Sequence, residues 1–303
     1  MTRARPANRV RVRRFGVAGG PRAVDDRVAG EEPLELRWRQ GDGWTPLVIT
    51  MRTPGADFEL AAGFLLAEGI VGSRDDLRGM AYCSDVAEEQ HYNVVNVELA
   101  PSARRPTVEE LRRFAATSAC GVCGKGQLEA LSMAGCRPVA ASDPFPASLI
   151  ASLPGRMRAH QALFDRTGGL HAAALFDHHG ALLALREDVG RHNALDKLFG
   201  WALLEGLLPL HGALVCVSGR ASYELAQKCV VAGVSLLAAV SAPSSLAIDV
   251  ARRFDLALAG FVRDGRFNLY TGEARVVDDL AATRATDLRR DEADGAASRS
   301  ARR

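Results

Sequence analysis

Apolar and polar residues alternate over much of the first third of the chain, as is typical of half-buried strands. Residues 34–38 alternate, the turn residues 41–43 follow, and residues 47–51 resume the strand pattern. A helix is predicted over residues 57–66, and alternation returns over residues 92–99. These patterns predict a small β-rich α+β domain.

Short apolar segments alternate with helical segments in the second half of the chain. Strands are predicted over residues 172–176, 181–185, 213–217, 235–240 and 267–270, and helices over residues 193–204, 223–232 and 245–259. Strands that alternate with helices predict an α/β fold, a layered sheet with helices on its faces.

The two ends of the chain are polar and lack an apolar period, so both are predicted to be disordered. The predicted organisation is a disordered basic tail (1–20), the small α+β domain (21–115), the α/β domain that begins with a cysteine-pair loop (116–280), and a disordered tail (281–303).

Composition adds little, with 48% hydrophobic residues, 24% charged residues and a net charge of +2. This charge gives no reason to expect nucleic acid. The N-terminus lacks the apolar stretch of a secretory signal, and the longest apolar run, near residues 230–240, is too short for a membrane helix. We therefore expect a cytoplasmic protein without a membrane partner, whose cysteines are mainly reduced. Lysine occurs only at Lys125, Lys197 and Lys228, each beside a motif discussed below.

The most informative segment is the motif Cys120-Gly121-Val122-Cys123, which lies among glycines and ahead of a predicted helix at residues 127–133. Glycines favour a loop over a packed element. The helix N-terminus and Lys125 would both favour thiolate over thiol.

Four interpretations of this pair are possible. A structural zinc site usually needs four ligands, and Cys136 has no adjacent partner, so no metal is predicted. A purely structural pair would lie among apolar residues. A thioredoxin-like pair would open a helix directly after a strand. A sulfur-transfer pair would carry a persulfide on one thiol, with the second thiol assisting release. The motif alone supports redox chemistry and sulfur transfer equally well.

Polar, glycine-rich loops recur at the predicted strand ends, and several lead into helix starts that attract anions. They cover residues 167–171, 187–193, 217–220, 241–245 and 261–266. An elongated ligand that carries phosphates is expected there, with Arg191, Arg220, Arg263 and Arg266 as candidate contacts. Taken singly, these residues also have structural interpretations: Ser218 and Gly219 as a helix cap, Asp188 and Arg191 as a surface ion pair, and His192 or His211 as a core histidine.

Together these motifs resemble the FdhD/NarQ family of formate dehydrogenase accessory sulfurtransferases. The segments that carry the resemblance include Cys120–Gly124, Leu170–Ala174, Glu187–Leu198, Ser218–Glu224, Val240–Pro243 and Gly265–Thr271. The resemblance implies a sulfurtransferase that takes sulfur from a cysteine desulfurase. It would pass the sulfur to the molybdenum cofactor in its bis(molybdopterin guanine dinucleotide) form, as formate dehydrogenase activity requires.

The resemblance also implies site residues. Cys120 and Cys123 would be the catalytic residues: Cys120 would carry the persulfide, and Cys123 would support it. Residues of the cofactor-binding domain that would line the cofactor site are Phe261, Val262, Arg263, Asp264, Gly265 and Arg266. The larger domain would be similar to cytidine deaminases, and the protein would form a homodimer.

Deaminase chemistry itself is not expected, because a zinc deaminase needs His-x-Glu and Pro-Cys-x-x-Cys. Here Ala172 and Ala173 follow His171, and no proline precedes Cys120. Two rival functions stay open, an insertion chaperone that holds the cofactor and a thiol oxidoreductase.

Overall fold

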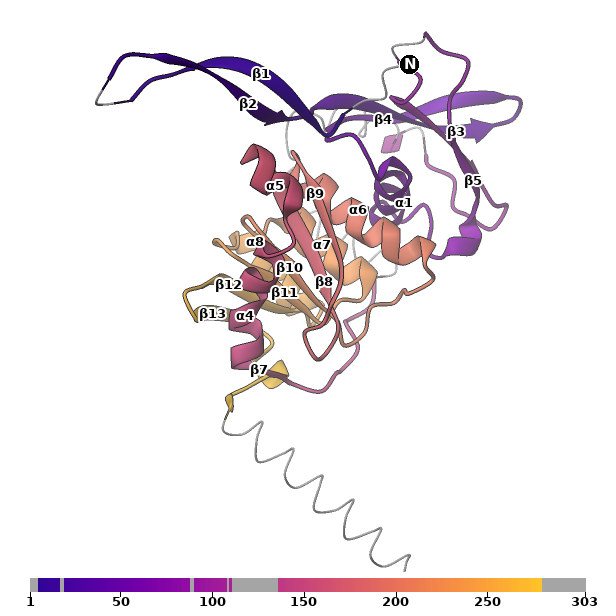
Figure 1. The fold of residues 1–303 in the computed structure, drawn as a ribbon. Coiled ribbons are helices and arrows are strands. Elements are labelled where there is room, and N and C mark those ends of the chain that lie inside the picture. Colours follow the sequence, from indigo (N-terminus) through magenta and orange to yellow (C-terminus); the bar gives the residue numbers. More distant parts are fainter. Residues whose placement is uncertain (1–4, 17–18, 88–89, 108, 111–135, 280–303) are drawn as a thin grey trace, which may run out of the picture.

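A six-stranded sheet forms the centre of the larger half of the protein (Figure 1). The computed structural model describes residues 5–16, 19–87, 90–107, 109–110 and 136–279. The strand order is β13 (Arg266–Thr271), β12 (Ala257–Arg263), β11 (Leu236–Ala239), β10 (Leu214–Val217), β8 (His171–Phe176) and β9 (Leu182–Asp188). The neighbours β10, β11 and β12 are parallel, whereas the pairs β8–β10, β8–β9 and β12–β13 are antiparallel.

Helices cover both faces of this sheet, because its central strands are apolar on both sides. One face packs with α6 (Arg191–Leu204), α7 (Tyr223–Ala232) and α8 (Ser245–Arg253). The other face packs with α4 (Ala147–Arg158). Alternation along β8 sends Ala173 and Leu175 to the first core and Ala172 and Ala174 to the second. The predicted layered α/β arrangement is confirmed, while the likeness to cytidine deaminases stays a prediction.

A second sheet of four strands belongs to the N-terminal half. Its order is β4 (Gly43–Arg52), β3 (Glu32–Gln40), β6 (Val94–Leu99) and β5 (Leu77–Tyr82). Helix α1 (Asp57–Ala67) packs against it, and the inward residues Leu34 and Leu36 join one hydrophobic core with α1, α6 and α7. The predicted α+β unit therefore shares its core with the α/β half. The domain boundaries drawn from the sequence stay predictions.

The predicted N-terminal tail is wrong for residues 7–14. They form β1 (Ala7–Arg14), which pairs with β2 (Arg22–Ala29) in an antiparallel ribbon that projects from the body of the protein (Figure 1). Valines alternate with arginines along β1. In the register of the ribbon, Val12 lies directly opposite Val24. The strand period was present in the sequence, but the high charge hid it.

The helix predicted over residues 245–259 is also too long. Helix α8 ends at Arg253, and Asp255 adopts a left-handed conformation with φ 58°. A short polar side chain tolerates this conformation, which ends the helix. The next residues, 257–260, are fully buried and continue as strand β12. A short apolar run fits either a buried helix or a buried strand, so periodicity could not separate the two.

Several elements had no prediction. They are α5 (Ala162–Thr167), β7 (Phe145–Pro146), β14 (Val276–Val277), the 3₁₀ turns Arg74–Asp76 and Glu273–Arg275, and also α4, β2 and β5. The helix predicted at residues 127–133 lies outside the described residues. Among the helices that are described, none combines the length and the apolarity of a membrane span.

Two glycines bring α1 and α6 into backbone contact. A Cβ at Gly63 would overlap the carbonyl oxygen of Asp196, and a Cβ at Gly200 would overlap the carbonyl oxygen of Glu59. The two helices can therefore cross this closely only because both positions lack a side chain. This crossing joins the two halves of the protein.

We expect Gly63→Ala to lower the free energy of unfolding by about 1–3 kcal/mol, because the methyl group must force the helices apart. Chemical denaturation measures the change. Gly155→Ala in α4 is the matched control: nothing lies within 4 Å of the added Cβ. That substitution should be neutral or slightly stabilising. Equal losses in the two variants would contradict the proposed steric cause.

Candidate functional site

The polar loops gather at one edge of the six-stranded sheet. Given the strand directions, the carboxyl ends of β9, β10, β11 and β12 meet the amino ends of β8 and β13 at this edge. We call it the strand-end site. Its principal side chains are those of His171, Arg191, His192, Ser218, Arg220, Ser222, Glu224, Arg263 and Arg266. Helices α6 and α7 both begin here, so two sets of free helix N–H groups face the same edge.

A half-buried histidine stands at the start of β8. The Nδ1 atom of His171 lies 3.4 Å from the Ser218 hydroxyl, which accepts a hydrogen bond from the Ala172 N–H at 2.9 Å. Burial lowers the pKa of His171, and the nearby positive charge of Arg191 lowers it further. His171 therefore enters the site as a neutral hydrogen-bonding group at neutral pH.

A hydrogen bond between side chains links the first turns of α6 and α7. The Nε2 atom of His192 lies 2.7 Å from Oε2 of Glu224 and 3.3 Å from the Ser222 hydroxyl. The hydrogen bond from His192 holds the pKa of Glu224 below its ordinary value. His192 is 35% exposed, so it is not a core histidine. Sequence reasoning gave Glu224 no role, because an acidic residue in a first helical turn is common.

Four arginines were predicted to contact phosphate, and the structure places all four at or beside this edge. Arg191 opens α6, and its buried Nε atom has no hydrogen-bond partner within the described part of the chain. Arg220 is exposed in the loop before α7. Arg263 and Arg266 are exposed and face each other across the β12–β13 hairpin. A buried guanidinium N–H without a partner is costly, which makes Arg191 the strongest candidate of the four for an anion contact.

The expected surface ion pair between Asp188 and Arg191 does not form. Asp188 is fully buried, and its Oδ2 atom lies 2.7 Å from Nζ of Lys197. A carboxylate with this little solvent needs a partner of opposite charge and several hydrogen bonds, and α6 supplies the lysine.

Thr53, which directly follows β4, completes the network around Asp188. Its N–H donates to Oδ2 of Asp188 at 3.1 Å, and its carbonyl oxygen accepts from Lys197 at 2.7 Å. Asn193 donates to the Met51 carbonyl at 2.7 Å and to Oδ1 of Asp188 at 3.2 Å. The motif Glu187–Leu198 therefore fixes the N-terminal half against the start of α6.

A second buried ion pair fixes α6 to α7. Nζ of Lys228 lies 2.5 Å from Oδ1 of Asp196. Burial raises the pKa of Asp196, and the charge of Lys228 opposes that rise. Lys197 and Lys228 thus both act as buried ion-pair partners, and Lys125 lies outside the described residues.

The predicted cofactor-binding segment, residues 261–266, is the end of β12 and a tight hairpin turn. Phe261 has φ 53° and donates its N–H to the Ser241 carbonyl at 3.1 Å, which produces a bulge in β12. Asp264 and Gly265, with φ 53° and 72°, form a turn with two left-handed residues. The side chain of Val262 is fully buried in the core beside α4, so Val262 can offer only its backbone to a ligand. The cofactor contact itself stays a prediction.

The predicted catalytic residues, Cys120 and Cys123, lie outside the described residues. Of the cysteines that are described, Cys83, Cys216 and Cys229 are buried and Cys136 is half-buried. Burial raises the thiol pKa of Cys136, Cys216 and Cys229, which makes them poor nucleophiles. Within the described ranges, no group of three or more His, Cys, Asp or Glu side chains could hold a metal ion.

Comparison with known proteins assigns the chain to a family. The model of the FdhD/NarQ family matches residues 29–277, and the chain belongs to that family. A Streptomyces avermitilis protein named sulfur carrier protein FdhD is 49% identical over 277 residues, covering 90% of this chain and 95% of its own length. A Mycobacterium tuberculosis protein of the same name is 48% identical over 258 residues, covering 83% and 92%.

A solved structure shows the same fold. The crystal structure of a candidate formate dehydrogenase accessory protein from Desulfotalea psychrophila matches with a TM-score of 0.68. The match covers 89% of this chain and 99% of that one, at 23% sequence identity.

We expect Lys197→Met to destabilise the protein by about 3–5 kcal/mol, because Asp188 would keep a buried charge without its cation. Urea denaturation followed by circular dichroism measures the loss. The double variant Lys197→Met, Asp188→Asn should recover part of it, since the uncompensated charge is gone. A double variant less stable than Lys197→Met alone would show that the ion pair is not the cause.

Proposed function

We propose that this chain is a sulfur carrier of formate dehydrogenase maturation, a sulfurtransferase with Cys120 as the carrier residue. The observation on which the proposal rests is the near full-length likeness to relatives named sulfur carrier protein FdhD, at 49% identity over 90% of the chain. The sulfur donor is a cysteine desulfurase. The acceptor substrate is the molybdenum cofactor in its bis(molybdopterin guanine dinucleotide) form.

The loading step is a thiol exchange. The Cys120 thiolate attacks the outer sulfur of the desulfurase persulfide, a new S–S bond forms on Cys120, and the donor cysteine leaves as a thiolate. No external oxidant or reductant is needed, because one S–S bond replaces another. The reaction requires a carrier thiol that is readily ionised.

The delivery step uses the second cysteine of the motif. Cys123 attacks the inner sulfur, the sulfur of Cys120 itself, so that a Cys120–Cys123 disulfide forms and the outer sulfur leaves as hydrosulfide for the metal. The two electrons come from the Cys123 thiol, and a cellular dithiol reductant then restores the pair.

The other cysteines support this choice by exclusion. Cys216 and Cys229 are fully buried, and burial raises the pKa of both thiols. A persulfide must pass between two proteins, and a thiol inside the sheet and helix layers cannot meet either of them.

The strand-end site supports a ligand that carries phosphates. Two helix N-termini, the unpartnered Nε of Arg191 and the exposed Arg220 face this edge, and Arg263 and Arg266 flank its hairpin turn. A guanine dinucleotide is long enough to contact several of these groups, with its diphosphate near α6 and α7. We place the protein in the cytoplasm as a homodimer that meets both the desulfurase and formate dehydrogenase.

Incubation with a cysteine desulfurase and cysteine should add the mass of one sulfur atom to the protein, lost on reduction and absent in Cys120→Ala. Intact-protein mass spectrometry measures it. Cys136→Ala is the control and should load like the unaltered protein. If Cys120→Ala, Cys123→Ala still restores formate dehydrogenase activity in cells, the protein is an insertion chaperone rather than a carrier.

Guanosine diphosphate should raise the pKa of His171, because a phosphate nearby favours the protonated imidazole. A pH titration of the histidine resonances by NMR, with and without the nucleotide, measures the change. Arg191→Gln should weaken nucleotide binding about tenfold through loss of a charge-assisted hydrogen bond. His178, in the turn between β8 and β9 at the opposite edge, should show no response to the nucleotide. Nucleotide binding without any response of His171 would place the ligand elsewhere.

A further inference from the structure

Most arginines of the N-terminal ribbon lie on one face and its valines on the other. Because side chains alternate along a strand, directly opposed residues of β1 and β2 share a face. One face carries Arg9, Arg11, Arg13, Arg27 and Asp25, which we call the basic face. The other face carries Val10, Val12, Val24 and Val28, together with Asp26 in the middle and Arg14 and Arg22 at the far end.

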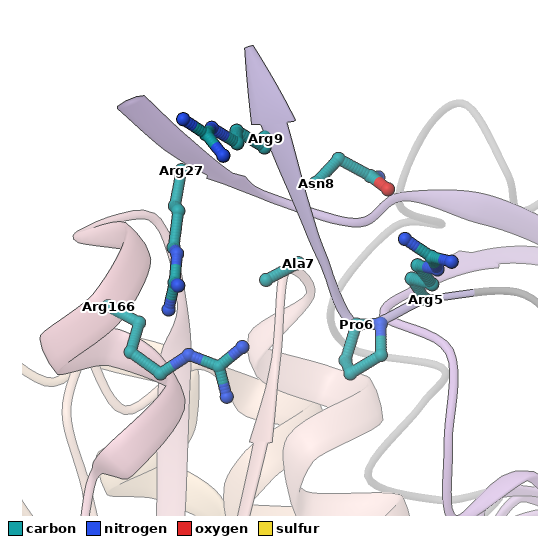
Figure 2. Close-up of a pocket in the computed structure, with 7 residues that line it drawn as sticks. All are labelled: Arg5, Pro6, Ala7, Asn8, Arg9, Arg27 and Arg166. Carbon is teal, nitrogen blue, oxygen red and sulfur yellow. The ribbon is translucent and has the colours of Figure 1, made fainter. Parts of the chain in front are cut away.

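A groove lies between the basic face and α5. It has a volume of about 320 Å³ and is lined by Arg5, Arg9, Arg27 and Arg166 (Figure 2). A neighbouring hollow of about 480 Å³ shares Arg9, Arg27 and Arg166 and adds Asp25 and Asp26. Figure 2 shows Arg27 of β2 extending toward α5, with the side chain of Arg166 from α5 beside its end. Arginines thus converge on this groove from two elements that are distant in sequence.

Most of this positive charge is not neutralised. Asp25 pairs with Arg9 and, at 3.2 Å, with Arg11. Among the described residues, no carboxylate lies within ion-pair distance of Arg5, Arg27 or Arg166. Arg9 and Arg27 are also directly opposed across the ribbon. Like charges in directly opposed positions destabilise a strand pair, so an anion between them would stabilise the ribbon.

The ribbon also offers backbone hydrogen bonds. β1 and β2 pair only with each other among the described strands, which leaves an outer edge on each. Along β1, arginines recur at every second residue, which spaces them about 7 Å apart. An extended peptide bound to that edge has the same repeat, so acidic side chains at alternate positions would each meet an arginine.

We propose that the groove and the outer edge of β1 bind an extended segment of a partner protein with acidic residues at alternate positions. β1 and β2 contain no aromatic residue, and Phe15, which directly follows β1, is a single exposed ring, so the ribbon has no row of platforms for successive nucleotide bases. An acidic peptide uses both features of the ribbon, the arginine spacing and the free strand edge. This surface is separate from the strand-end site and does not depend on the sulfur-carrier proposal.

The test measures binding of a fluorescein-labelled peptide of alternating glutamate and valine to the full chain, by anisotropy at low and at physiological salt. Arg27→Gln, Arg166→Gln should weaken binding about fivefold or more, since two charge contacts are lost. Arg78→Gln, Arg137→Gln removes the same charge from exposed positions outside the ribbon and should leave the affinity unchanged.

Two further probes decide what is recognised. A peptide of the same composition with its glutamates in one block should bind several-fold more weakly, because its spacing does not match the strand. A single-stranded oligothymidylate should bind more weakly than the alternating peptide. The proposal is overturned if the groove variant keeps full affinity, if both peptides bind equally, or if the oligonucleotide binds more tightly and responds to the same substitutions.

Discussion

The strand-end site depends on one buried ion pair, that between Asp188 and Lys197. Removal of these two charges from water is costly, and the cost is offset only because Thr53, Gly190 and Asn193 satisfy the remaining hydrogen-bonding positions. The geometry that satisfies them fixes three segments at once: the end of β4, the end of β9 and the start of α6. The first residues of α6, which bring Arg191 and His192 to the edge of the sheet, are therefore oriented by a contact below the surface.

The same helix is held from the other side by packing. Gly63 and Gly200 allow α1 and α6 to approach at backbone distance, beside the shared core. The ion pair sets the orientation of α6, and the glycine contact sets its distance from α1. The crystal structure from Desulfotalea psychrophila shares this fold over 89% of the chain at 23% sequence identity.

Secondary structure was predictable from the sequence where a single hydrophobic period, that of a strand or of a helix, dominated a segment. The strands at residues 172–176 and 213–217 and the helix at residues 223–232 were predictable because their apolar patterns were unambiguous. Prediction failed for α8 and β12, where Asp255 ends the helix by a backbone conformation that no pattern records. The motif Glu187–Leu198 was recognised but its structural role was not. Thr53 and Met51, which bond to Asp188 and Asn193, lie more than 100 residues away, in β4 and the residue after it. The burial of Val262 could not be predicted either, because the bulge at Phe261 changes which side chains of β12 face the core.

Two consecutive residues at the end of β9 hold different parts of the molecule. The Glu187 carboxylate accepts the N–H groups of Leu163 and Phe164 at the start of α5, whereas Asp188 anchors α6. Helix α5 carries Arg166 on the groove below the ribbon. The helix that lines the groove and the helix that presents Arg191 are therefore both anchored at the end of β9, through two adjacent carboxylates.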